Sequence, residues 1–239
     1  MLKLKKYLRN YEVISMYFAI IGDIVESKKI LNRNEAQEKL NHILKDINIE
    51  YERNIAAKFI ITLGDEFQGL LSNPIHLFDI IDKIKFKMYP IKIRFGVGIG
   101  NIHTNINKEM ALGADGPAYH YARKMIEEIK ILNKTNSKSQ YNTDIGVSSI
   151  YKTDIVSLIN SNLCLCYFIE EKWTDKQREL IEKIMFSNKT QREIANELNL
   201  VQSSVQRRLK SSGYYNYIYV KHSLNRVLME VWGEYKYAD

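Results

Sequence analysis

The order of hydrophobic patterns along the chain constrains its fold more than any single motif. Short apolar runs typical of strands occur at MYFAIIG, AAKFII, the residues after LGDE, and KIRFGVGIG. Two longer segments, 33–54 and 73–90, repeat apolar residues every three or four positions, which is the period of an amphipathic helix. The predicted order is therefore strand, helix, strand, strand, helix, strand.

That order predicts an α+β fold of the ferredoxin-like, split βαβ type. A helix over GPAYHYARKMIEEIKIL, with Pro117 in its first turn, and a further strand at DIGVSSI extend the same unit. We therefore expect one domain over residues 16–150. Residues 1–15 form a separate basic arm in this interpretation, and residues 151–171 form a connector to a second domain.

Composition and charge place few limits on function. The 239 residues are 45% hydrophobic and 26% charged, which is ordinary for a globular protein. The net charge is +7, but basic side chains cluster in the first 15 residues and the remainder is close to balanced. Charge alone therefore does not predict nucleic-acid binding.

Several observations favour a cytoplasmic protein without membrane contact. No apolar run approaches the length of a membrane span, and the N-terminal residues lack the apolar centre of a signal peptide. The two cysteines, Cys164 and Cys166, are too close in sequence for a relaxed disulfide and have no zinc-site partners. We expect reduced thiols.

Two acidic motifs predict a metal and nucleotide site. In the split βαβ fold the first strand lies beside the hairpin, so Asp23 at the end of that strand would face Asp65 at the hairpin tip. Two such carboxylates can share a Mg²⁺ or Mn²⁺ ion that also binds phosphate oxygens. Glu66 would then serve as a base or second ligand. Further candidate contacts to a nucleoside triphosphate, ATP or GTP, are Lys28, Lys29 and Arg94.

These motifs carry a family resemblance. LGDEF resembles the signature hairpin of GGDEF diguanylate cyclases, and GDIV resembles their first metal-binding aspartate. The run from RFGVGIG to HYARKM resembles a segment of class III nucleotide cyclases that bears a catalytic Asn and Arg. GDIVESKKI, GDEFQGLL and GADGPAYHYAR, followed by a helix-turn-helix, together resemble the SatD family of bacterial proteins over roughly residues 16–230.

The resemblance implies roles for individual residues. Asp23, the Ile24 carbonyl and Asp65 match metal ligands, while Glu66 and Arg123 match catalytic positions. The pattern departs at two places: Leu63 replaces the first Gly of GGDEF, and Tyr119 stands where cyclases have Asn. Simpler interpretations remain open. Asp65 could satisfy a tight turn, Asp23 could form a hydrogen bond at a strand end, and Arg123 could pair with Glu127 on the helix surface.

The last third of the chain predicts a helix-turn-helix domain over residues 172–239. KWTDKQRELIEKIMF, capped by Thr174, is followed by KTQREIANELNL and VQSSVQRRLKSSGYY, with a tight turn between the last two. The sequence resembles region 4 of sigma factors. In the third helix, Val205 and Leu209 would pack inward, and the residues available to double-stranded DNA are Gln202, Ser203, Ser204, Gln206, Arg207 and Lys210.

Three functions fit these patterns. The leading one is a bacterial regulator that forms a homodimer. In it, residues 16–150 form a cyclase-like palm domain that binds Mg²⁺ and a nucleotide, and this domain is coupled to a DNA-binding helix-turn-helix. The alternative is an active nucleotidyl cyclase or nucleotidyltransferase that produces a signalling nucleotide. The third is an adaptor that uses both domains for protein contacts.

Overall fold

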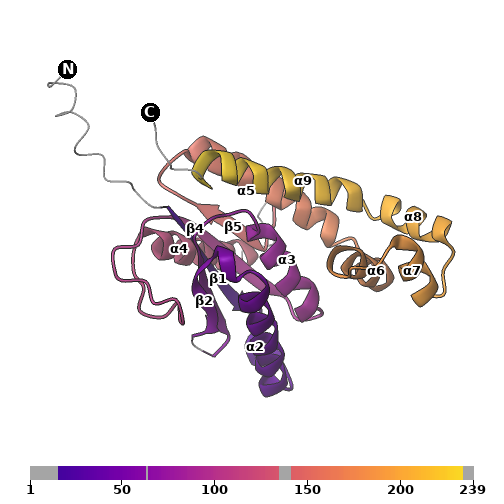
Figure 1. The fold of residues 1–239 in the computed structure, drawn as a ribbon, viewed down its shortest axis with the longest axis horizontal. Coiled ribbons are helices and arrows are strands. Elements are labelled where there is room, and N and C mark those ends of the chain that lie inside the picture. The colour runs from indigo at the N-terminus through magenta and orange to yellow at the C-terminus, as the bar shows by residue number, and fades with distance from the viewer. Residues whose placement is uncertain (1–15, 63, 135–140, 234–239) are drawn as a thin grey trace.

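The computed structural model describes residues 16–62, 64–134 and 141–233 (Figure 1). Residues 1–15, predicted to form a basic arm, lie outside the described residues. Leu63, which stands at the position of the first Gly of GGDEF, also lies outside them. The protein is a mixed α+β structure built on one five-stranded sheet. None of the helices in the described part is both long enough and apolar enough to span a membrane, and Cys164 and Cys166 are free thiols.

The sheet has the strand order β2-β3-β1-β4-β5. Neighbouring strands among the first four pair antiparallel, and β5 pairs parallel to β4. The strands are β1 (Tyr17–Ile24), β2 (Ile55–Ile61), β3 (Glu66–Leu71), β4 (Ile93–Gly100) and β5 (Ile145–Ser148). Helix α2 (Arg33–Glu50) joins β1 to β2, and α3 (Leu77–Met88) joins β3 to β4, so the predicted order of elements is confirmed.

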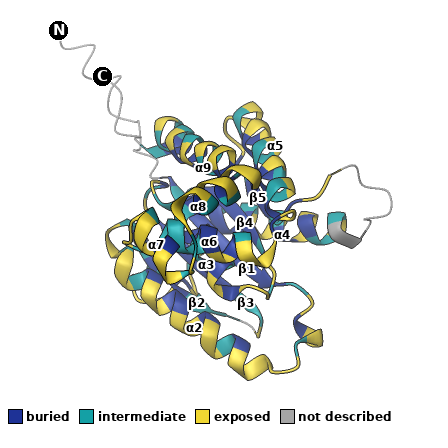
Figure 2. Ribbon diagram, turned by 90° about the vertical axis from the view of Figure 1, so that its right-hand side faces the viewer, coloured by how far each residue is buried: buried dark blue, intermediate teal, exposed yellow. Residues whose placement is uncertain are grey.

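Strand β1 is buried along almost its whole length because helices cover both faces of the sheet. Side chains alternate across a strand. Phe18 and Ile20 accordingly join the core beneath α2 and α3, whereas Ala19 and Ile21 join the core beneath α4 (Pro117–Lys134). Figure 2 shows the buried strands between helices whose outer faces are exposed.

Glycines in β4 set how closely α4 approaches the sheet. A Cβ atom added at Gly98 would lie 1.8 Å from the Ala118 carbonyl oxygen, and one added at Gly96 would lie 2.1 Å from the Ala122 carbonyl oxygen. Only glycine permits this contact between backbones. The alternating glycines of the sequence therefore hold α4, and the polar side chains along it, directly over the sheet.

The helical part follows β5. Its helices are α5 (Thr153–Glu170), α6 (Asp175–Phe186), α7 (Gln191–Glu197), α8 (Gln202–Ser211) and α9 (Tyr214–Leu228), and α9 continues into a π-helical turn over Met229–Gly233. Capping boxes at Thr174 and Thr190 start α6 and α7. The segment predicted as a connector is largely the regular helix α5, whose apolar residues Val156, Ile159 and Leu163 pack into the core with β5.

Helix α9 returns from the helical part to the sheet, alongside α5 (Figure 1). Its residues Leu224 and Leu228, with Trp232 beyond it, belong to the same core as α2 and α3. The C-terminal segment that the sequence grouped with the helix-turn-helix thus packs against both parts. The two parts share a continuous interface instead of being joined by a loose linker.

Candidate functional site

Three adjacent strands bring the predicted charged residues into one row. Asp23 on β1 lies opposite Glu66 on β3 and opposite Arg94 on β4 in the strand register. The backbone N–H of Ile24 donates to the carbonyl oxygen of Asp65 at 3.2 Å. The topology therefore places the end of β1 beside the hairpin tip, as the element order predicted.

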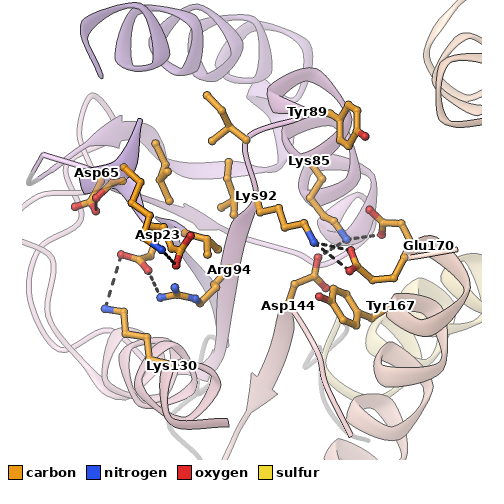
Figure 3. Close-up of a pocket in the computed structure, with 18 of the residues that line it drawn as sticks. Asp23, Asp65, Lys85, Tyr89, Lys92, Arg94, Lys130, Asp144, Tyr167 and Glu170 are labelled. Carbon is orange, nitrogen blue, oxygen red and sulfur yellow. Dashed lines mark hydrogen bonds and ion pairs between the residues drawn. The ribbon is translucent and has the colours of Figure 1, made fainter. Parts of the chain in front are cut away.

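These residues form a network of ion pairs in the structure (Figure 3). Arg94 Nη1 lies 2.7 Å from Asp23 Oδ2, and Lys130 Nζ on α4 lies 3.7 Å from the other Asp23 oxygen. Lys130 Nζ is also 3.9 Å from Glu66, whose carboxylate accepts a hydrogen bond from Arg123 at 2.5 Å. Arg123 thus pairs with Glu66 across the sheet face, whereas Glu127 pairs with Lys130.

Burial and charge act in opposite directions on Asp23. The residue is only 5% exposed, and burial raises the pKa of its carboxyl above the ordinary value. The positive charges of Lys130 and Arg94 oppose that rise but do not cancel it. The ionised form of Asp23 is therefore stabilised by its two cationic neighbours against the cost of burial.

The hairpin tip is fixed from two sides. The Ser27 hydroxyl donates to the Asp65 carboxylate, and the Gln37 amide on α2 donates to the carbonyl oxygen of Gly64. Gly64 has a φ of +60°, a conformation that glycine adopts without strain. Ser27 begins the short 3₁₀ helix η1 (Ser27–Lys29), so this contact also positions the two exposed lysines that follow it.

The arrangement does not fit a divalent cation as it stands. Both carboxylate oxygens of Asp23 face cationic side chains, which would repel a metal ion. Across residues 16–62, 64–134 and 141–233, no three or more His, Cys, Asp or Glu side chains are grouped to hold a metal. Mg²⁺ binding by Asp23, the Ile24 carbonyl and Asp65 stays a prediction.

A cavity of about 990 Å³ opens beside this network. Its wall on the sheet side contains the predicted metal ligands and the predicted phosphate contacts. These residues are Asp23, Ile24, Asp65, Lys28, Lys29 and Arg94. Glu66 also lines this wall, but Arg123 does not. Its other wall comes from the helical part, and that wall is formed in large part by Tyr167, Glu170, Glu171, Trp173 and Arg178. The cavity therefore lies between the two parts of the molecule.

Sequence reasoning missed Lys130 and the residues of the second wall. Lys130 follows Arg123 by seven positions, which is two helical turns and the same helix face, so its position was available from the predicted helix. Arg178 and Glu170 form a buried pair at 2.9 Å, and Glu170 also contacts Lys85. No local pattern identifies these contacts, since they depend on how α3, α5 and α6 pack.

The predicted DNA-contacting residues lie together on α8. Val205 and Leu209 are fully buried, as expected for the inward face. Ser204 is half-buried, and the other members of the set are exposed: Gln202, Ser203, Gln206, Arg207 and Lys210. Helix α7 ends at Glu197 and α8 begins at Gln202, and Asn199 adopts a left-handed φ of 52° in the turn between them.

Comparison with known proteins gives one clear assignment. The chain resembles a solved structure described as a regulator of polyketide synthase expression from Bifidobacterium adolescentis, with 13% identity over 95% of this chain and 89% of that chain. The TM-score is 0.26, a level that does not define a common fold. No curated protein matches. The model of the SatD family matches residues 17–228, which is most of the sequence, and the chain therefore belongs to the SatD family.

Proposed function

We propose that this protein is a bacterial regulator in which a nucleotide-binding palm domain is coupled to a DNA-binding helix-turn-helix. The palm domain corresponds to the four antiparallel strands with α2, α3 and α4, in a ferredoxin-like arrangement. The helix-turn-helix corresponds to α6, α7 and α8. The nucleotide would bind in the cavity between the two parts.

The chemistry of the cavity supports a phosphorylated ligand. Lys28, Lys29, Lys92, Arg94 and Lys130 all line it, and Lys28, Lys29 and Lys92 are exposed. Carboxylates line it as well, and two of them pair with exposed lysines, Glu26 with Lys29 and Glu171 with Lys92. Cationic side chains on an open cavity are suited to phosphate oxygens. Triphosphate binding would also supply oxygen ligands for Mg²⁺, and would give Arg94 and Lys130 an alternative to Asp23.

The geometry of α8 supports DNA binding. Its exposed face carries Gln, Ser and Arg side chains, which are the types that read base edges and hold phosphates in helix-turn-helix proteins. The two capping boxes fix the starts of α6 and α7. Helix α8 is consequently presented on a framework with defined helix ends.

The observation that carries the coupling is the position of Trp173. This residue lines the cavity, and its Nε1–H donates to the carbonyl oxygen of Ser212 at 2.7 Å. Ser212 is the C-terminal cap of α8. A ligand that shifts Trp173 or the adjacent Arg178 would therefore act on the end of the DNA-contacting helix through one hydrogen bond.

The first test is calorimetric titration of ATP and of GTP, with and without Mg²⁺, into the wild type and Asp65→Ala. We expect binding by the wild type and at least about tenfold weaker binding by Asp65→Ala, because the variant loses the contact that positions Lys28 and Lys29. Asp46→Ala, which removes an exposed carboxylate on α2, is the matched control. Absence of nucleotide binding by the wild type would overturn the palm-domain proposal.

The second test is DNA binding by fluorescence anisotropy over a range of salt concentrations. Arg207→Ala should weaken binding and reduce the magnitude of the logarithmic salt slope by about 1, while Lys39→Ala on α2 should change neither. If a bound nucleotide changes the affinity for DNA, DNA must change the affinity for the nucleotide by the same factor. A nucleotide that binds the protein but leaves its affinity for DNA unchanged would contradict the coupling.

Product analysis of the same mixtures tests the alternative, a nucleotidyl cyclase or nucleotidyltransferase. Arg123, expected on phosphate in such an enzyme, is paired with Glu66 here, and Tyr119 occupies the position of the catalytic Asn. The structure therefore favours binding over turnover. Homodimer formation is a prediction that sedimentation of the wild type, with and without nucleotide, would test.

A further inference from the structure

Helix α5 is apolar on two opposite faces. One face packs into the core with β5, and the other presents Leu158, Leu165 and Phe168, which are 65%, 60% and 58% exposed. Residues 155–169 include no charged side chain. A helix that is apolar all round is typical of a buried position, and an exposed apolar patch marks a site of interaction. The composition of α5 therefore indicates that a partner covers its outer face.

The polar side chains on this outer face already have acceptors within the helix. The Ser161 hydroxyl donates to the Ser157 carbonyl oxygen at 2.9 Å, and the Asn162 amide nitrogen donates to the Leu158 carbonyl oxygen at 2.8 Å. A buried donor without an acceptor is costly. Since these donors keep their acceptors when the face is covered, a partner can pack against α5 without that cost.

Strand β5, at the end of the sheet, does not offer an alternative contact at its centre. Asn160 of α5 donates to the Val147 carbonyl oxygen and accepts from the Val147 N–H, both at 2.8 Å. These are the backbone groups that a further strand would need. Helix α5 lies outside β5 and beside α9 (Figure 2). Contact with a partner on this side of the molecule therefore falls on α5.

We propose that the outer face of α5 is a homodimer interface in which two copies of the helix pack antiparallel. A two-fold axis near Leu163 brings Leu158 of each copy against Phe168 of the other, because both are five positions from Leu163. The same axis places the small Ser161 of one copy opposite Leu165 of the other, so a large side chain meets a small one. The interface requires neither the nucleotide nor DNA.

The charges at the two ends of the helix favour a second copy as the partner. Asp154 and Lys172 are both exposed, and each is nine positions from Leu163. In the antiparallel dimer, each Asp154 lies opposite Lys172 of the other copy, which gives two pairs of opposite charge at the rim. A parallel dimer would place each charge opposite its own kind. Helices that lie on lipid surfaces are rich in Lys and Arg, and α5 contains neither.

Sedimentation velocity of the full chain over a range of protein concentrations tests the dimer. We expect the wild type to dimerise and Leu165→Lys to raise the dissociation constant at least about tenfold, because two unpaired charges enter an apolar contact. Ile49→Lys is the matched control: Ile49 is 77% exposed on α2, and we expect the dissociation constant of the wild type. Circular dichroism should show equal helix content in both variants, since both positions are exposed.

A charge exchange tests the antiparallel arrangement. Asp154→Lys or Lys172→Asp alone places like charges opposite each other at both ends, and each should weaken the dimer about 3- to 10-fold. The double variant Asp154→Lys/Lys172→Asp restores opposite charges and should recover most of the lost affinity. Recovery requires that the two positions meet across the interface.

Four outcomes would overturn the proposal. A wild type that stays monomeric at every concentration would exclude the dimer, and a dimer unaffected by Leu165→Lys would lie on another surface. Failure of the double variant to recover affinity would exclude the antiparallel pairing. If monomeric wild type, but not Leu165→Lys, cosediments with phosphatidylglycerol vesicles, the face binds a membrane surface instead. None of these outcomes affects the proposals of nucleotide or DNA binding, which are tested by separate measurements.

Discussion

Two groups of ion pairs in this protein have the same chemistry and opposite surroundings. Asp82 on α3 pairs with Lys221 on α9 at 2.7 Å and accepts a hydrogen bond from Tyr217 at 2.9 Å, and both charged residues are 1% exposed. In the other group, at the strand ends, Arg123 has a side chain that is 44% exposed in its pair with Glu66. The first pair is enclosed in the core, whereas the second faces solvent.

The difference separates charges that hold the fold from charges that a ligand can reach. A buried pair is expensive to disrupt, because the remaining charge loses its partner without gaining water. A solvent-exposed pair is weak, and its members can exchange partners at little cost. We therefore expect the Asp82–Lys221 pair to be structural and the Glu66–Arg123 pair at the strand ends to be functional.

The largest effect should come from Lys221→Met, which leaves Asp82 buried without its cation. We expect a loss of about 3–5 kcal/mol in the free energy of unfolding, measured by urea denaturation. The double variant Asp82→Leu/Lys221→Met should recover most of this loss, since it leaves no buried charge. A single variant as stable as the wild type would remove the distinction between the two groups of ion pairs.

The same variant should respond to acid. Burial already raises the pKa of Asp82 above its ordinary value, with Lys221 as the strongest opposing charge. Without Lys221 the pKa rises further, so the folded variant takes up a proton more readily than the unfolded chain does. Its stability deficit relative to the wild type should therefore shrink as the pH falls from 7 toward the ordinary range of aspartate.

The next largest effect should come from Glu170→Gln at the wall of the large cavity. Glu170 contacts Lys85 at 2.5 Å and Arg178 at 2.9 Å, and its side chain is 8% exposed. Replacing the carboxylate weakens two charge-assisted hydrogen bonds, and we expect a loss of about 2–3 kcal/mol at pH 7.

Acid titration of unfolding tests the charge of Glu170. Burial acts to raise the pKa of Glu170, but Lys85 and Arg178 outweigh it and the pKa lies below the ordinary 4.5. The carboxylate therefore contributes stability above pH 4.5, and this contribution is lost as the pH falls through the lowered pKa. The difference in the free energy of unfolding between the wild type and Glu170→Gln should decrease only below pH 4.5. Narrowing at higher pH would mean that Glu170 is not an ionised partner of both cations.

A smaller effect is expected for Arg94→Gln. The Asp23–Arg94 pair is less buried than the Asp82–Lys221 pair and more buried than the Glu66–Arg123 pair. Arg94 pairs with Asp23 at 2.7 Å, and the side chains are 13% and 8% exposed. Lys130 remains near Asp23, so we expect a loss of about 1–2 kcal/mol at pH 7, less than for Lys221→Met. The pKa of Asp23 should rise further, and the deficit should decrease on acidification. Arg53→Gln, an exposed arginine, serves as the control, and equal losses in the two variants would refute the role of the Asp23 pair.

Much of the fold followed from the sequence because it depends on local periodicity. The order of elements could be derived from the alternation of strand and helix patterns, and with it the position of the end of β1 beside the hairpin. Asp23 was expected to face Asp65, but the strand register places it opposite Glu66, one residue further along. The cationic partners of Asp23 and Glu66 could not be derived from the sequence. Arg94 was predicted to bind a ligand, yet it pairs with Asp23, because burial of that carboxylate requires a nearby cation.

The junction between the two parts could not be predicted from sequence patterns. Residues 151–171 were expected to connect two domains, but the apolar residues of α5 cover β5. Residues of α9 likewise join the core of the sheet, with Lys221 reaching Asp82 across more than a hundred positions of sequence. Contacts of this kind depend on tertiary packing, which a helical period alone does not encode.

The smallest effect on stability, and the sharpest contrast with Lys221→Met, should come from Glu66→Gln. Its partner Arg123 is partly exposed, so loss of the ion pair should change the free energy of unfolding by less than about 1 kcal/mol. The effect on ligand binding should be larger than the effect on stability.

Glu66 adds negative charge beside the proposed phosphate site and is paired with Arg123, so Glu66→Gln should strengthen the binding of ATP or GTP severalfold in the absence of Mg²⁺. Glu38→Gln on the exposed face of α2 should leave affinity and stability unchanged. If Glu66→Gln instead weakens binding only when Mg²⁺ is present, Glu66 is a metal ligand in the bound state, and the pairs with Arg123 and Lys130 are exchanged for the metal when the nucleotide binds. A loss of stability as large as that of Lys221→Met would place Glu66 with the structural ion pairs.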